Sequence, residues 1–557
     1  MNQSFKSLVV LGLAAYAGAA IACDSNSCCT ASCNNCDNGT YGMTYFHARE
    51  ASQNLPLRMM GVADKMHLFD KECEFYGVFS VALGYERSFK GSKIGKYFGF
   101  DGTCSTLFSQ DTTATTPNGI APDTNSDARA IDWGLGTSSR TTLSFSPRID
   151  KVLIDLDLFL GLDEFINGLW MRVSAPLVWA RYNLNPCEVV TTSDSTAYGP
   201  FFVNDTDAEV AVPYTTVVDA WKAFGAYGDV HAATKGKIRC GSDSKFRLGS
   251  LDLQFGYDMI RNECAHLGIF IHGVAATGNK ADATYLFEPI AGTYNWQLGG
   301  GLGGSWTMWN KNDEQKLTLY GEWLMTHMFK RSQERLLGLT LNGTTAGNSW
   351  ILLKKFSAAH AYDGEIDRAT DMLARCIKVG NNFMTDFALM LQYQRCAFDF
   401  SIGYNFWYRS KDKTSCSNNS CGTSSCCSAN NNCSTTATFA ADTYGIKGVN
   451  SAAGARSVFF YSKTNSDIST SGSVVVADAT EGQTTATAAD YVLETDVTSC
   501  VALAPSAYSN KIFGYIGHNW LDCDHAPYLG LGGMFEWARQ NRAATQFGVY
   551  LKGGISF

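Results

Sequence analysis

Cysteine and histidine are the residues of this chain whose types and spacing could do chemistry. The sequence has 19 Cys and 9 His among 557 residues. Cys33 and Cys36 have the C-x-x-C spacing that metal and redox sites use, but no His stands at a finger-like distance from them. Isolated His residues fall on strand-like or turn segments, where their role is usually structural: His266, His272, His327, His518 and His525. No short motif pairs Ser or Asp with His, so the sequence predicts no enzyme, no metal and no cofactor.

Structural disulfides in Ser- and Asn-rich loops are the interpretation of the cysteines that we favour. One cluster begins at residue 23 and another lies between residues 416 and 433. In a secreted protein such clusters predict a disulfide framework whose pairing the sequence does not give. The disulfide candidates are Cys28, Cys29, Cys33, Cys36, Cys187, Cys240, Cys416, Cys421, Cys426, Cys427 and Cys433.

Residues 1–22 have the three-part layout of a secretory signal peptide. A Lys precedes an apolar run that is too short for a stable membrane helix. Cleavage would leave Cys23 at the new N-terminus, where lipid attachment is the alternative to ordinary cleavage. The Cys-rich segment 23–74 lacks strand patterning, and we expect it on the periplasmic side.

The C-terminal eleven residues carry the most specific local pattern. Phe547, Val549, Leu551, Ile555 and Phe557 fall on one face of an extended chain, and Gly, Tyr, Lys and Ser fall on the other. This segment resembles the closing strand of Gram-negative outer-membrane β-barrels of the porin type. The resemblance implies that the terminal Phe is an insertion signal read by the barrel-insertion machinery.

The same alternation recurs along the chain in about twelve segments, the first at 75–89. Short turns follow every second segment, and longer connections lie between the pairs: 90–140, 184–245, 278–293, 331–382 and 411–509. Only the connection 539–543 departs from this rule, because it is short. This layout predicts an all-β, transmembrane, antiparallel up-and-down barrel over residues 75–557, with short periplasmic turns and long extracellular loops. Within one of these loops, apolar residues at helical spacing predict a helix over 363–378.

Alternation also assigns an inward face to the predicted barrel. Acidic residues outnumber basic ones there, so an open pore would weakly favour cations. The alternative is that these charges pair across a narrow lumen and close it. The pore-lining candidates are Glu86, Asp155, Asp157, Arg172, Asp252, Asp258, Glu322, Asp399, Arg409, Glu536 and Lys552.

Three functions remain open at the level of sequence. The first is an outer-membrane, porin-like channel for small hydrophilic solutes or ions. The second is a structural or adhesive surface protein with disulfide-stapled loops on a plugged barrel, because the cysteine abundance resembles the chlamydial major outer-membrane protein class. The third is an outer-membrane hydrolase. The expected partners are outer-membrane lipid, the insertion machinery, small hydrophilic solutes and further copies of the chain. The mild net charge of −8 gives no argument for nucleic-acid binding, and none is expected.

Overall fold

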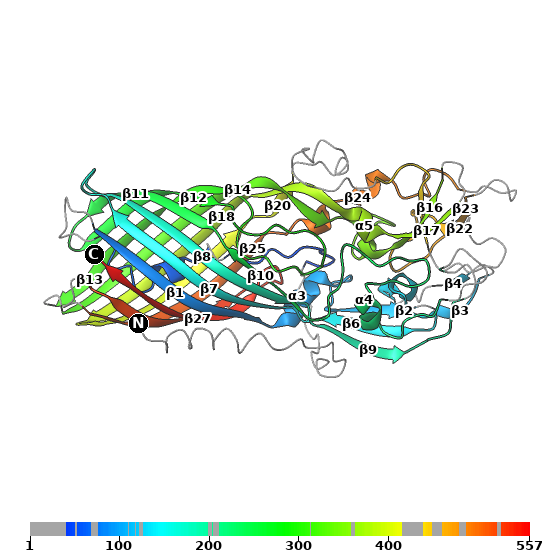
Figure 1. Ribbon diagram of the computed structural model, residues 1–557, viewed down its shortest axis with the longest axis horizontal. Helices are drawn as coiled ribbons and strands as arrows, with labels where there is room; N and C mark the ends of the chain where they lie inside the picture. The colour runs from blue at the N-terminus through cyan, green and yellow to red at the C-terminus, as the bar shows by residue number, and fades with distance from the viewer. Residues whose placement is uncertain are drawn as a thin grey trace, which may run out of the picture.

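The computed structural model describes residues 40–50, 53–67, 76–109, 111–116, 119–121, 126–198, 203, 211–311, 314–357, 362–414, 438–447, 459–477, 486–520 and 525–557. Figure 1 shows a barrel of tilted strands at one end of the molecule and a second body, built from the connections between strands, at the other end. In the described part of the chain, no helix is both long and apolar enough to span a membrane.

The barrel closes because the first strand pairs with the last. The main sheet has 14 strands, of which β10 and β20 are short extensions, and the remaining twelve form the closed wall. The wall strands are β1 (Tyr76–Phe89), β7 (Arg148–Gly161), β8 (Leu169–Asn183), β11 (Leu251–Arg261), β12 (Ala265–Ala275), β13 (Gln297–Lys311), β14 (Gln315–Leu336), β18 (Ala374–Arg395), β19 (Phe398–Arg409), β25 (Ala507–Asn519), β26 (Tyr528–Trp537) and β27 (Thr545–Ser556). All neighbours in the wall are antiparallel, and β1 pairs with β27 from Val78–Ser556 to Phe89–Thr545. The predicted strand number and order are confirmed.

The connections at one end of the barrel are short and those at the other end are mostly long, as the sequence predicts. The turns at one end include 262–264 and 396–397, whereas the connections at the other end reach from 410 to 506. Following the convention of such barrels, we call the end with short turns periplasmic and the end with long connections extracellular.

Apolar side chains cover the outside of the wall. Ile402 is 66% exposed and Leu531 is 63% exposed, and β11 exposes Leu253, Phe255 and Tyr257 on the same face. Their neighbours in sequence point inward and are buried, as Asp252 and Gln254 show. A band of this kind is compatible with hydrocarbon, because the closed sheet leaves no backbone donor or acceptor without a partner strand.

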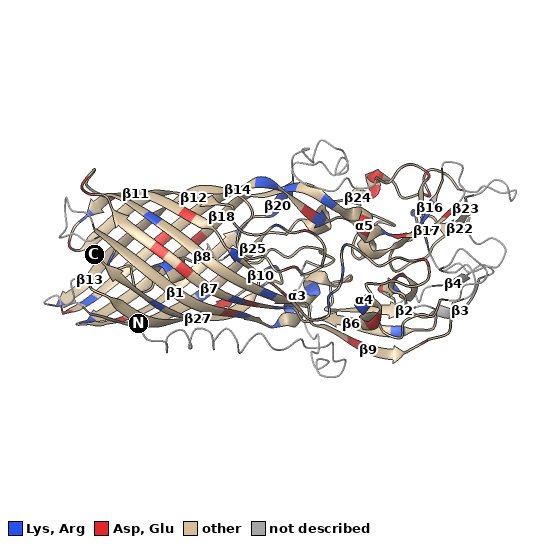
Figure 2. Cartoon of the chain, viewed as in Figure 1, with Lys and Arg blue, Asp and Glu red and all other residues tan. Residues whose placement is uncertain are grey.

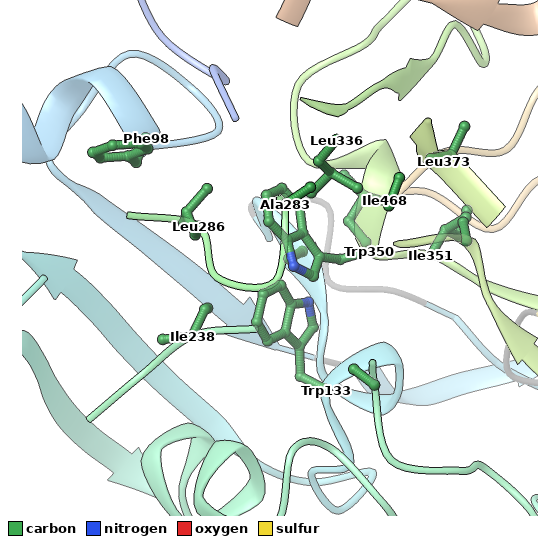
Figure 3. Packing of buried hydrophobic residues seen from close by; sticks show 14 of the residues in the cluster. Phe98, Trp133, Ile238, Ala283, Leu286, Leu336, Trp350, Ile351, Leu373 and Ile468 are labelled. Carbon is green, nitrogen blue, oxygen red and sulfur yellow. The ribbon is translucent and has the colours of Figure 1, made fainter. Parts of the chain in front are cut away.

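The extracellular connections fold into a body with its own apolar core. Its strands are β2 (Ser105–Ser109), β3 (Asp111–Thr116), β4 (Gly119–Ala121), β5 (Ala128–Arg129), β6 (Arg140–Phe145), β9 (Pro186–Thr192), β10 (Ser242–Leu248), β15 (Gly338–Leu339), β16 (Leu352–Phe356), β17 (Tyr362–Arg368), β20 (Asp412–Thr414), β21 (Tyr444–Ile446), β22 (Phe459–Tyr461), β23 (Val474–Val476) and β24 (Val497–Thr498). Its short helices are α3 (Gly91–Phe98), α4 (Val217–Lys222), α5 (Ala369–Leu373), and the 3-10 turns η1 (Ala130–Trp133), η2 (Asn348–Trp350), η3 (Glu494–Asp496) and η4 (Cys500–Ala502). The core packs Trp133 against Trp350, with ring centroids 6.1 Å apart (Figure 3).

The prediction of one helix over 363–378 is wrong. Only α5 is helical there, and β17 and β18 occupy the rest of that range. Ile366, Leu373 and Ile377 are buried, as their spacing suggested. They are buried in the core of the extracellular body rather than on one face of a helix. The reason is that β17 pairs with β16, and that β18 extends beyond the barrel wall into the extracellular body.

A charge placed on the outer face is expected to oppose insertion. Ile402→Arg and Leu531→Arg should each destabilise the inserted barrel by about 2–4 kcal/mol, if the site lies near the membrane midplane. Urea or guanidinium unfolding of the refolded protein in lipid vesicles measures this change. Val189→Arg is the matched control, because Val189 is also exposed but lies on β9 in the extracellular body. Equal effects at all three positions would contradict the placement of the apolar band.

Candidate functional site

The lumen of the barrel contains the N-terminal segment. We call residues 40–50 and 53–67 the plug; it includes α2 (Leu55–Met59). At the extracellular mouth, the Asn541 side chain donates a hydrogen bond to the Thr40 carbonyl, and the Gly42 amide donates to the Gly99 carbonyl at 2.7 Å. At the other end, His67 reaches Asp258 near the periplasmic turn of β11 and β12. The plug therefore runs the length of the lumen.

The expectation that 23–74 lies in the periplasm is corrected for the described part of that segment. The correction has a physical cause, since the inward-facing acids of the wall leave a lumen that needs cationic partners. The plug supplies three of them in Arg49, Arg58 and Lys65, each buried. Residues 1–39, which include the expected signal peptide and Cys23, lie outside the described residues.

Arg49 joins the plug to the wall in the extracellular half of the barrel. Its guanidinium donates to Asp386 at 2.9 Å and to Glu536 at 3.1 Å, which lie on β18 and β26. Lys511, on β25, lies 3.4 Å from the other oxygen of Glu536. The backbone carbonyl of Arg49 accepts a hydrogen bond from Lys151 at 2.8 Å. The guanidinium also donates to Asn405 Oδ1 on β19 at 2.9 Å, so Arg49 contacts four wall strands, β7, β18, β19 and β26. Figure 2 shows charged positions on the strands midway along the barrel.

Arg58 makes a similar ion pair between plug and wall, closer to the periplasmic end of the lumen. It pairs with Asp252 on β11, and its carbonyl accepts a hydrogen bond from Arg172 at 2.9 Å. Arg172 in turn pairs with Asp157 at 2.5 Å. Lys552 donates to the carbonyl of Leu57 at 2.7 Å. Here the wall's cations bind the plug backbone and the wall's acids bind the plug side chain.

Apolar contacts surround these polar ones. Leu55, Leu57 and Met60 of the plug are fully buried against wall residues that include Phe159 and Phe270. The plug is therefore held in the lumen by apolar packing as well as by ion pairs with the wall. A cavity of about 90 Å³ lies between the periplasmic part of the plug and strands β12, β13 and β14, which is room for a few water molecules.

The structure brings most pore-lining candidates together on the plug. Asp157, Arg172, Asp252, Asp258, Glu536 and Lys552 contact plug residues or a residue that does so, and Glu86 accepts from Asn54 at 3.4 Å. Asp155 is buried with Oδ1 unpaired, and Glu322 has Oε1 unpaired, among the described residues. Asp399 accepts from the wall residue Gln392 at 2.8 Å. Arg409 lies at the mouth and pairs with Asp412 at 2.6 Å.

Sequence reasoning found Glu536 but missed the other residues of the Arg49 site. Asp386 and Lys511 follow the same inward alternation as the candidates and could have been found by it. Arg49 and Arg58 stand in a segment with no strand period, and their acidic partners are distant in the sequence. Arg49 lies 337 positions from Asp386 and 487 from Glu536, and Arg58 lies 194 from Asp252. No local sequence pattern predicts an ion pair between residues so far apart.

The cysteine expectations are only partly within the described residues. Cys187 is disulfide-bonded, as are Cys104 and Cys376, which were not candidates. Cys240 is half-buried, and its pairing stays open. Cys28, Cys29, Cys33, Cys36, Cys416, Cys421, Cys426, Cys427 and Cys433 lie outside the described residues. Cys264, Cys396 and Cys500 are exposed and free.

Two neighbouring carboxyl groups, those of half-buried Glu288 and exposed Asp282, stabilise the extracellular connection between β12 and β13. Glu288 accepts hydrogen bonds from the amides of Asp282 at 3.1 Å and Tyr285 at 2.9 Å. Burial, and then the adjacent Asp282 carboxylate, raise the pKa of Glu288 to about 8. Burial opposes ionisation of Asp282 too, but the hydrogen bonds from Glu288 and Thr284 lower the pKa of Asp282 to about 2. The two carboxyl groups therefore hold one proton between them at neutral pH.

Comparisons with known proteins give the following. No family model matches the chain, and no curated protein matches it. Among solved structures, an outer membrane channel from Pseudomonas putida F1 is similar with a TM-score of 0.31 and 10% identity, over 86% of this chain and 96% of that one. The transport unit of the autotransporter AIDA-I from Escherichia coli has a TM-score of 0.27 and 8% identity, over 91% and 99%. The CymD monoaromatic hydrocarbon channel has a TM-score of 0.24 and 9% identity, over 91% and 93%.

These neighbours are outer-membrane β-barrels, but at such scores the likeness carries no argument about this chain. The barrel rests on its own strand pairings, and the function rests on the site described above. None of the three belongs to the chlamydial class, so that likeness stays an expectation.

Removing the Arg49 side chain is expected to loosen the plug without unfolding the wall. Arg49→Ala leaves Asp386 and Glu536 buried without their shared cation, which costs about 3–5 kcal/mol. Hydrogen exchange of the amides of residues 53–66 should then be at least about 100-fold faster, at 1.4 kcal/mol per factor of ten. Arg87→Ala is the control, since Arg87 is half-exposed and lies 3.8 Å from Asp150, away from the plug. Unchanged exchange in Arg49→Ala would refute the role given to this ion pair.

The Asp282–Glu288 pair predicts a loss of loop stability at alkaline pH. Because the pKa of folded Glu288 is above its unfolded value of 4.5, its contribution is complete below that value and is lost as pH rises through about 8. Leu286 and Phe287 belong to the same core as Trp133, so Trp fluorescence should report a lower thermal transition of the extracellular body at pH 9 than at pH 7. Glu288→Gln should abolish that difference, whereas Glu314→Gln, at an exposed periplasmic turn, should keep it. The same pH dependence in Glu288→Gln and the parent would contradict the assignment.

Proposed function

We propose that this protein is an outer-membrane channel for small hydrophilic solutes or ions, closed by its plug in the state described. The observation that carries the proposal is that charges join the plug to the wall, as at Arg49 with Asp386 and Glu536 and at Arg58 with Asp252. Displacement of the plug would leave a wall lined with carboxylates, which water and cations can solvate.

Buried ion pairs favour this proposal over a permanently filled anchor. Such pairs add little net stability compared with apolar packing of the same volume, because both charges must be desolvated. A barrel that served only as an anchor could fill its interior with apolar side chains. Ion pairs that can be exchanged for water suit a segment that moves.

The proposal includes secretion by a signal peptide at residues 1–22 and insertion by the barrel-insertion machinery. The terminal residue is well placed for such recognition, because the backbone of Phe557 pairs with Gly77 at the periplasmic end of the seam, with hydrogen bonds of 2.7 and 2.9 Å. It includes no catalytic step, and hydrolysis remains the third alternative. Assembly into homo-oligomers is left as an expectation.

A surface platform is the second candidate, and the extracellular body favours it. Its core buries Trp133, Trp221 and Trp350 completely or nearly so, which is more than loops need merely to connect strands. The core is continuous with Met43 and Phe46 of the plug. A structural or adhesive role would use this body as the working part and the plugged barrel as its anchor.

Conductance in planar bilayers distinguishes the two candidates. The parent protein should be closed most of the time, with rare discrete openings. The double variant Arg49→Ala/Arg58→Ala should open far more often, with cation preference in a salt gradient, because the acids of the wall are then unpaired. Arg87→Ala should behave as the parent does.

Neutralising the wall separates the pore from leakage around the protein. Adding Asp252→Asn and Glu322→Gln to the double variant should shift the preference toward anions at unchanged opening frequency. A well-inserted double variant that never conducts would sink the channel proposal and leave the surface platform.

A further inference from the structure

Two histidines and one carboxylate meet at the periplasmic end of the plug. His67 Nδ1 lies 2.6 Å from one oxygen of Asp258, and His266 Nε2 lies 3.0 Å from the other. The two imidazole rings stack with centroids 3.8 Å apart. One potential ligand atom from each of the three side chains lies within 4.8 Å of those of the other two. All three residues are near-completely shielded from solvent.

We propose that His67, Asp258 and His266 bind a divalent transition-metal ion of the Zn²⁺ type, which fastens the plug to strands β11 and β12. Imidazole nitrogens with one carboxylate oxygen suit Zn²⁺ and its neighbours in the first transition row, whereas Ca²⁺ and Mg²⁺ prefer oxygen ligands throughout. Such metal–ligand distances are about 2.0–2.2 Å, so the two imidazole rings, which now stack with an angle of 22° between their planes, would have to turn until both nitrogens point at the ion.

The surroundings of the carboxylate hold it in position for this task. Trp170 donates its indole N–H to Asp258 Oδ1 at 2.9 Å, which is the kind of outer contact that orients a ligating carboxylate. Gly268 gives the group its space. A Cβ at Gly268 would lie 2.6 Å from Asp258 Oδ1 and 3.4 Å from His266 Nε2.

The backbone of His67 supports a functional role for its side chain. His67 has a φ of +60°, in the left-handed region that residues other than Gly rarely adopt. Conformations of this kind are retained where the surrounding structure fixes them, and they gather at ligand clamps and switches. Here the fixed contact is the bond from His67 to Asp258.

The cavity of about 90 Å³ gives the site an approach and an open coordination position. His67 and His266 line it together with Cys264 and Glu322. Glu322 Oε1 is buried without a hydrogen-bond partner among the described residues. Cys264 is an exposed free thiol at the periplasmic turn. An ion can therefore reach the triad from the periplasmic side, and a water molecule can complete its shell.

The inference is independent of the channel, because it concerns binding and not conductance. A bound ion would nevertheless stabilise the docked plug. At a free metal concentration of 100 times Kd, a ligand that binds only the docked form slows undocking-limited exchange of the plug amides by about 100-fold.

The test is a titration of the refolded full-length protein, without a His tag, treated with chelator and with its free thiols alkylated. Zn²⁺ binding is followed by calorimetry, and Co²⁺ binding by the visible absorption that reports nitrogen and oxygen ligation. We expect one equivalent per chain in the parent. His67→Gln, His266→Ala and Asp258→Asn should each weaken binding at least 10-fold, whereas His327→Ala should not, since His327 is exposed on the outside of β14.

His67→Gln guards against misfolding, because it changes the plug and leaves the wall intact; heat-modifiable migration on gels confirms a folded barrel. Absence of stoichiometric binding in the folded parent would overturn the proposal. So would equal affinity in the parent and in His67→Gln. Metal binding with no conductance in any variant would reject the channel and leave the metal site standing.

Discussion

A sheet in contact with hydrocarbon must pair every backbone amide and carbonyl with another strand, and the seam between β1 and β27 meets that requirement here. With no free edge, the alternation of each strand becomes a division between lipid and lumen. The apolar half of every strand lies outside, as Ile402 and Leu531 do, and the other half, with its acids and bases, is forced inside. The polar interior therefore follows from the closed wall.

That interior is narrow and charged, and both properties explain the plug. Twelve strands enclose little more than a single segment of chain, and carboxylates so enclosed need cations or water. The plug supplies Arg49 and Arg58 to the acids of the wall, and its backbone carbonyls accept hydrogen bonds from Arg172 and Lys552. The same segment then rises into the extracellular body, where Met43 and Phe46 join the loop core. The plug therefore contacts both the wall and the loop core.

The wall could be predicted from the sequence because its rule is local. Period-two alternation and the sorting of loop lengths repeat twelve times, and each repeat obeys the same constraint. The inward acids followed from the same rule, but their partners did not. Arg49 meets Asp386 across 337 positions, and nothing in the sequence near residue 49 indicates it. The helix prediction for 363–378 was wrong for a related reason. Ile366 and Leu373 are buried, but the loop core that buries them is assembled from connections that are distant in the sequence. Burial could be predicted there, and local conformation could not.

The position of the plug is the claim on which both the function and the metal site depend. Photo-crosslinking in intact cells measures it most directly, with a diazirine amino acid in place of Leu57, which is buried in the lumen. Crosslinks mapped by mass spectrometry should join residue 57 to wall strands of the same chain, in the neighbourhood of Lys552, whose amine contacts the Leu57 carbonyl. Crosslinks to other periplasmic proteins, with none to the wall, would place the segment outside the barrel and contradict the account.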